Sequence, residues 1–106
     1  MLVQHQIKAY IKSNYLPSVL KQITINEDIS QRLLTLTVKI DLIKTLKQAK
    51  DIGTFIIGNF IEFQQLVEQS ILESLEESGI MLSSSGLNTS FYIHNCSLPR
   101  HNLESI

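Results

Sequence analysis

The residues best suited to chemistry lie near the C-terminal end of the chain. His94, Cys96 and His101 stand close together there, and a strand would place His94 and Cys96 on one face, because side chains two residues apart point the same way. With His5 they suggest a zinc site, but the second closely spaced Cys or His pair of a structural zinc site is missing. A thiolate nucleophile would need an orienting acid, and none lies nearby in the sequence. We therefore expect no catalytic, cofactor or metal site, and keep a small enzyme or metal-binding protein using His94 and Cys96 as an alternative.

Charge is divided unevenly along the chain. Residues 1–50 carry eight basic and three acidic side chains, whereas residues 51–106 carry one basic and seven acidic. The halves should attract each other, within one chain or between two copies. The predicted contact for a basic protein partner is a group of four glutamates, Glu68, Glu73, Glu76 and Glu77. The other candidate contact is an unpaired edge of the predicted sheet.

The basic N-terminal half also suggests an alternative function, that of a nucleic-acid-binding dimer. Its contact face would contain Lys8, Lys12, Lys44 and Lys47. The pI near 6.3 and the lack of an arginine cluster argue against the electrostatic footprint of such a protein. Gly53 and Gly58 have the spacing of a phosphate-binding loop, but the lysine of that motif is absent. Nucleic acid is therefore the less favoured partner.

Length and composition predict one small domain. The 106 residues contain 43% apolar side chains and a single cysteine, so a disulfide framework within the chain is excluded. We expect one α+β domain over residues 1–98 and a loosely ordered tail over residues 99–106. No apolar run reaches the length of a membrane span, and the N-terminal residues lack the apolar core of a secretory signal, which predicts a cytoplasmic protein.

Two segments show the period-two alternation of strands. Ile23 and Ile25 alternate with polar residues, and the pattern from Leu34 to Ile40 is the clearest in the chain. Turn-forming residues lie between them, so the sequence predicts an antiparallel hairpin over about residues 21–40. A helix over about residues 2–14 should precede it, ending before Pro17. A last strand is expected over about residues 89–96.

Residues 42–78 form the dominant amphipathic stretch. Apolar residues recur there at alternating spacings of three and four, which predicts a long, continuous or kinked helix that begins after the capping residue Asp41. A break near Gly53 and Gly58 is the alternative. Self-association is predicted through six apolar residues of this stretch, Ile52, Phe55, Ile56, Phe60, Phe63 and Val67.

The predicted fold is two-layer α+β with the element order α-β-β-α-β. A small antiparallel sheet would pack against a short N-terminal helix and the long helix over 42–78. The expected function is a non-enzymatic protein–protein interaction module, such as a small adaptor, assembly chaperone or inhibitor. It would act as a homodimer or larger homo-oligomer through residues 52–67 and bind a further protein partner.

Overall fold

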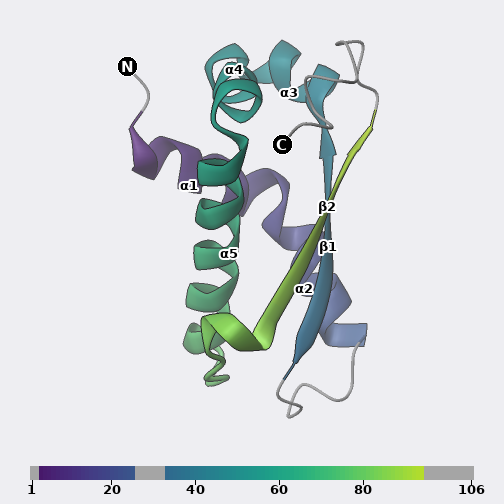
Figure 1. Cartoon of the computed structure of the whole chain (residues 1–106), viewed down its shortest axis with the longest axis vertical. Helices are drawn as coiled ribbons and strands as arrows, with labels where there is room; N and C mark the ends of the chain where they lie inside the picture. Colours follow the sequence, from purple (N-terminus) through teal and green to yellow (C-terminus); the bar gives the residue numbers. More distant parts are fainter. Residues whose placement is uncertain (1–2, 26–32, 95–106) are drawn as a thin grey trace.

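The computed structural model describes residues 3–25 and 33–94 of the chain. Over these residues the chain forms, in order, α1 (Gln4–Asn14), α2 (Leu16–Ile25), β1 (Leu34–Asp41), α3 (Leu42–Gln48), α4 (Lys50–Gly58), α5 (Phe60–Glu77), the 3-10 helix η1 (Ser84–Gly86) and β2 (Leu87–His94) (Figure 1). The described part is mostly helical. The predicted helix over residues 2–14 and the strand over residues 34–40 are confirmed by α1 and β1.

The sheet consists of two parallel strands, and the predicted antiparallel hairpin is wrong. β1 and β2 pair from Leu34 beside Leu87 to Asp41 beside His94, and both strands run in the same direction in Figure 1. A parallel pair needs a long crossover connection, which α3, α4 and α5 provide. The element order is thus α-α-β-α-α-α-β instead of α-β-β-α-β.

The first strand of the predicted hairpin is part of α2. Leu16, Val19 and Ile23 recur at spacings of three and four, and all three are buried, so this helical face outweighs the short alternation around Ile23. Pro17 does not end the helical region, because it lies in the first turn of α2, where its missing N–H has no helical partner to lose. The predicted turn after residue 25 lies outside the described residues.

The predicted long helix over 42–78 is broken twice. Ala49 and Asn59 leave the helical conformation, with φ of −148° and −139°, and so separate α3, α4 and α5. Asp41 accepts a hydrogen bond from Lys44 N at 3.0 Å, as expected for the capping residue. The helical stretch ends at Glu77, one residue before the predicted end, and Gly79 beyond it has a φ of +84°, which suits a glycine after a helix.

Gly53 does not break the helix, although its position suggested a turn. It lies inside α4 and is buried. A Cβ atom at this position would lie 2.6 Å from Leu46 Cδ2, so a larger residue would push α3 and α4 apart. The glycine is therefore needed for the close approach of these two helices.

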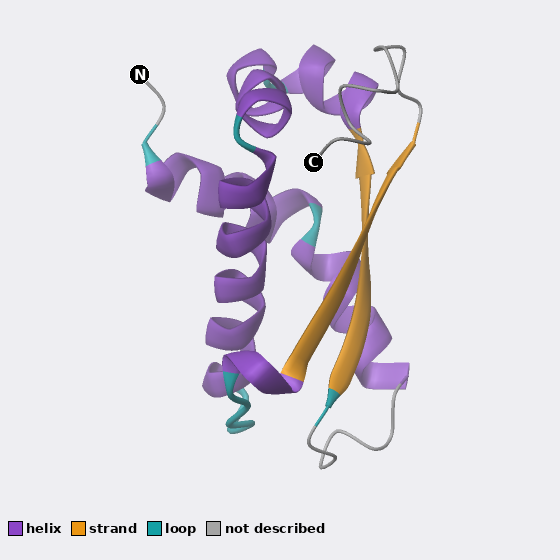
Figure 2. Cartoon of the chain, viewed as in Figure 1, coloured by secondary structure: helices purple, strands orange, loops and turns teal. Residues whose placement is uncertain are grey.

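One face of the sheet packs on the helices and the other faces solvent (Figure 2). The inward side chains of β1 are buried to 2% exposure or less, namely Leu34, Leu36, Val38 and Ile40. The outward side chains Thr35 and Lys39 are exposed. Phe63 of α5, fully buried, lies in the same core as these inward residues.

Candidate functional site

The outer edge of β1 is closed by α2. Gln22 donates a hydrogen bond from Nε2 to Thr37 O at 2.5 Å and accepts one at Oε1 from Thr37 N at 3.0 Å. One side chain thus satisfies both outward main-chain groups of Thr37, in the way that a neighbouring strand would. A further strand cannot pair with β1 at this position without displacing Gln22.

The outer edge of β2 has no neighbouring strand among the residues that the structure describes. Because Thr37 points its main chain away from β2, the strand alternation makes Leu36, Val38 and Ile40 the residues that bond to β2. In this register the residues opposite them point their N–H and C=O groups to the other side. These are Thr89, Phe91 and Ile93, and their outward main-chain groups have no hydrogen-bond partner among the described residues.

β2 also lacks the devices that normally protect an edge strand. Proteins guard exposed edges with charged side chains, proline, bulges or very short strands. The eight residues of β2, Leu87–His94, contain no proline and no Asp, Glu, Lys or Arg, and its pairing with β1 is continuous. This strand is therefore suited to accept a further strand.

The side chains that face the helices are also more deeply buried on β1 than on β2. Val38 and Ile40 of β1 are 1% and 0% exposed. Their register partners on β2, Phe91 and Ile93, face the same helical layer but remain only half-buried. Phe91 contacts Phe60 edge to face at a centroid distance of 5.9 Å. A rim of apolar surface thus accompanies the open main chain of β2.

The predicted self-association residues lie mostly inside the folded chain. Ile52, Ile56, Phe60, Phe63 and Val67 are buried at 0 to 8% exposure, and Phe55 is partly buried against the same core. Their apolar stripe is covered by the other elements of the same chain. Self-association is therefore not needed to shield it, and a contact between copies would need another surface.

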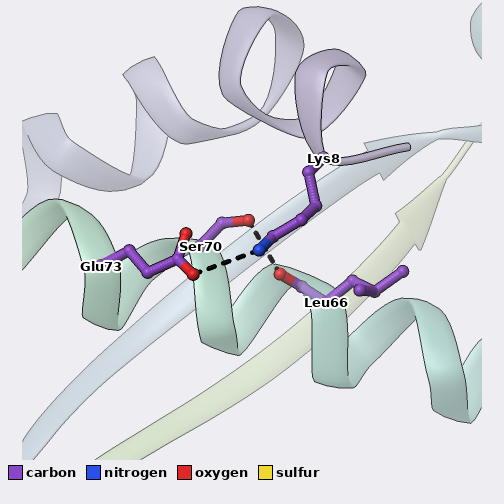
Figure 3. Close-up of polar contacts among 4 residues, drawn as sticks. All are labelled: Lys8, Leu66, Ser70 and Glu73. Atoms are coloured by element: carbon purple, nitrogen blue, oxygen red, sulfur yellow. Dashed lines mark hydrogen bonds and ion pairs between the residues drawn. The ribbon is translucent and has the colours of Figure 1, made fainter. Parts of the chain in front are cut away.

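Two of the four predicted partner-binding glutamates are already engaged within the chain. Glu73 of α5 forms an ion pair of 3.1 Å with Lys8 of α1 (Figure 3). In the same view Ser70 Oγ donates a hydrogen bond of 2.9 Å to Leu66 O inside α5. Glu68 Oε2 accepts a hydrogen bond of 2.8 Å from Thr89 Oγ1 and so ties α5 to β2.

The other two glutamates are exposed. Glu76 and Glu77 lie at the C-terminal end of α5 without a described side-chain partner. The structure therefore does not gather the four glutamates into one free acidic surface.

The reactive side chains form no described cluster. His94 ends β2, while Cys96 and His101 lie outside the described residues, and His5 is exposed on α1. No group of three or more His, Cys, Asp or Glu side chains is placed to hold a metal ion within the described part of the chain.

The four lysines predicted for nucleic acid lie on two helices, Lys8 and Lys12 on α1 and Lys44 and Lys47 on α3. Lys8 is engaged with Glu73. Two adjoining hollows of about 120 and 480 Å³, both lined by Asp41, lie at the carboxyl end of β1. Lys39 lines the smaller one, Lys47 the larger one and Lys44 both, so two of the four predicted lysines gather here together with Lys39.

A larger hollow of about 710 Å³ lies where α4 meets α5. Its polar lining consists mainly of side-chain amides, those of Gln4, Asn59, Gln65 and Gln69. Glu62 is the one charged residue in the lining. This composition offers no nucleophile or paired acid and base, so we do not assign a reaction to it.

Tyr15 is the described residue whose pKa is clearly shifted, and its contacts give it a structural role. Burial raises the pKa of Tyr15 to about 12. The Tyr15 hydroxyl lies 2.7 Å from Thr45 Oγ1, which itself donates to Asp41 O at 2.9 Å. Because Thr45 uses its proton on Asp41, Tyr15 is the donor in the first bond. The pair fixes the carboxyl end of β1 to the N-terminal helices.

Comparison with protein-family models, with curated proteins and with solved structures found no match for this chain. None of the helices in residues 3–25 and 33–94 has the length and hydropathy needed to cross a membrane.

Sequence reasoning named a sheet edge as a possible contact but could not say which residues form it. Thr89, Phe91 and Ile93 were missed because the pairing partner of β2 was unknown. The sequence feature that could have identified them is the run without charged residues over Leu87–His94.

Proposed function

We propose that this chain is a non-enzymatic protein–protein interaction module whose contact surface is the outer edge of β2. The observation that carries the proposal is the row of outward main-chain groups at Thr89, Phe91 and Ile93, which have no partner among residues 3–25 and 33–94. Edge strands bind extended segments through main-chain hydrogen bonds, and apolar side chains beside the edge add affinity. The half-buried Phe91 and Ile93 supply that apolar surface.

The contrast between the two edges supports the same proposal. A parallel pair with one face in water is unusual, because parallel sheets are generally covered on both faces. A further strand beside β2 would enlarge a two-stranded sheet that is marginal by itself. Self-association or a heterologous partner would both act in this way. Adaptor, assembly-chaperone and inhibitor roles and a cytoplasmic location are parts of this proposal.

Photo-crosslinking from β2 tests the function. Benzoylphenylalanine placed at Asn88, an exposed position on β2, should crosslink to a protein in cells of the source organism. Thr89→Pro should abolish this crosslink, because proline removes the outward N–H and blocks strand pairing. The same probe at Ser18, exposed on α2, is the matched control and should give no comparable product.

The monomer should tolerate Thr89→Pro, since the lost N–H bonds to nothing described. Circular dichroism would check that it folds. A crosslink from Asn88 that survives Thr89→Pro, or the absence of any protein crosslink from Asn88, would contradict a contact at this edge.

A further inference from the structure

We infer that the strand that pairs with β2 is β2 of a second copy, joined antiparallel about a two-fold axis at Ser90. This inference rests on the proposed function, because it names the partner of the same edge. The product is a continuous four-stranded sheet in the order β1-β2-β2-β1, with the helices of both copies on one face. An isologous contact of this kind closes on itself and gives a dimer.

The register follows from the geometry of β2. Side chains of Leu87, Thr89, Phe91 and Ile93 face the helical layer, and a continued sheet must place the partner's helix-facing side chains beside them. Every antiparallel register centred on a residue of β2 satisfies this condition, so the registers centred on Thr89, Ser90 and Phe91 are compared by how many outward groups they pair. The Thr89 register would pair Ile93 with residue 85 of the partner, before the start of β2. The Phe91 register would pair Leu87 with residue 95, beyond the end of β2. The Ser90 register pairs Leu87 with the partner's Ile93 and so uses the whole row of outward groups.

The side chains fit this register. Thr89 lies beside the partner's Phe91, so a small residue faces a large one, and Leu87 meets the partner's Ile93 as an apolar pair. The half-buried Phe91 and Ile93 of each copy would thus be covered by Thr89 and Leu87 of the other copy. On the outer face Asn88 meets the partner's Tyr92, whose side chain is 57% exposed in the single chain.

Charge favours a second copy over a charged peptide. Leu87–His94 contains no Asp, Glu, Lys or Arg, so the strand pairs with itself without opposing like charges. Glu68, whose carboxylate bonds to β2, is already paired with Thr89. Nothing described along this edge offers a charge that would select a basic or acidic segment, whereas an uncharged, β-branched and aromatic strand is what β2 itself provides.

A cysteine at the two-fold axis tests the register. Ser90→Cys, in a Cys96→Ser background, places two thiols in a non-hydrogen-bonded pair whose Cα atoms are roughly 4.5 Å apart, within the range of a disulfide. Mild oxidation should convert most of this variant to a covalent dimer. Asn88→Cys in the same background is the matched control, because it lies on the same exposed face but is roughly 13 Å from its own copy. We expect at least about tenfold less crosslinking from it.

Sedimentation tests the hydrogen bonds across the edge. The wild-type chain should associate to a dimer between about 1 μM and 1 mM, as expected for a small interface. Thr89→Pro should weaken the dimer by roughly 10- to 100-fold, because each dimer loses two hydrogen bonds. Thr89→Val keeps the N–H, loses the bond to Glu68, and should leave the dimer constant within about threefold.

The outcomes separate this inference from the proposed function. Dimerisation that is sensitive to Thr89→Pro, with disulfide formation at position 90 and not at 88, supports both. A dimer that tolerates Thr89→Pro overturns both. A chain that stays monomeric while Asn88 crosslinks to a different protein overturns the second copy and leaves the function standing. A monomer whose Phe91 and Ile93 amides resist hydrogen exchange shows that residues of the same chain cover the edge, which also overturns the inference.

Discussion

The main-chain groups at the two outer edges of the sheet differ in their hydrogen bonding. At β1 a helix lies along the strand, and Gln22 bonds to both main-chain groups of Thr37. At β2 the corresponding groups of Thr89, Phe91 and Ile93 have no described partner. The inward side chains of β1 are fully buried, while those of β2 beyond Leu87 are only half-buried.

This difference shows that the chain can close a sheet edge with its own side chains. Closure needs an amide side chain at the right height on a neighbouring helix, as Gln22 provides. Beside β2 the described elements offer Glu68, a carboxylate that accepts from the Thr89 side chain and cannot donate to a main-chain carbonyl. Within the described part of the chain, the open edge is therefore a property of one strand and not of the sheet as a whole.

The largest expected effect concerns the core that both strands share. Phe63→Ala should lower the free energy of unfolding by about 3–5 kcal/mol, because the side chain is fully buried. The loss should not depend on protein concentration in urea denaturation if Phe63 supports the single chain. Ile61→Ala on the exposed side of the same helix is the control, with a change within about 0.5 kcal/mol. A concentration-dependent loss at Phe63 would place this stripe between copies instead.

The next prediction opens the closed edge. Gln22→Ala should cost about 1–3 kcal/mol, because it removes two hydrogen bonds and leaves both outward groups of Thr37 unpaired. Hydrogen exchange of the Thr37 amide should accelerate, which NMR would detect. Lys21→Ala, at the exposed neighbouring position, should change neither quantity. Unchanged exchange at Thr37 in Gln22→Ala would mean that Gln22 does not protect this edge.

A third prediction concerns the end of β1. Tyr15→Phe should cost about 1 kcal/mol at neutral pH through loss of the hydrogen bond to Thr45. The folded chain holds the Tyr15 proton more tightly than the unfolded chain, because burial raises its pKa to about 12 from about 10. This contribution is therefore complete below about pH 10 and declines as the pH rises to about 12. Denaturation series at several alkaline pH values should show a smaller decline in Tyr15→Phe than in the wild type.

The smallest expected effect lies away from both edges. Glu73→Gln removes the ion pair with Lys8. The side chain of Lys8 is 24% exposed and that of Glu73 is 40% exposed. The cost should be about 0–1 kcal/mol and should shrink as salt is added. Glu77→Gln at an exposed position without a described partner is the matched control. A loss at Glu73 that exceeds the loss at Gln22 would show that the helical layer, and not edge closure, limits stability.

Local patterns in the sequence identified several elements correctly. The alternation from Leu34 to Ile40 predicted β1 because every second side chain had to be buried. Asp41 and Gly79 marked a helix start and end through the local chemistry of capping and of positive φ. These features depend on residues within one or two turns of each other, so the sequence carries them in full.

Tertiary contacts decided the rest. Ile23 could alternate in a strand or recur on a helical face, and packing against the core selected the helix. The break at Asn59 directly follows Gly58, where the alternative prediction placed one, whereas Ala49 shows no strong breaking signal. Packing on the sheet as three short helices thus decided the break at Ala49. Strand direction likewise came from the crossover that returns β2 beside β1.

At the outer edge of β2, too, the sequence determined one part and the tertiary structure another. By itself the sequence predicted a last strand over about residues 89–96, close to the observed Leu87–His94, and neither range contains proline, Asp, Glu, Lys or Arg. Only the tertiary structure decided that one side of this strand pairs with β1 while the other side has no described partner. The physical reason is that main-chain hydrogen bonds in a sheet join residues far apart in sequence, so their direction and completeness cannot be deduced from local patterns.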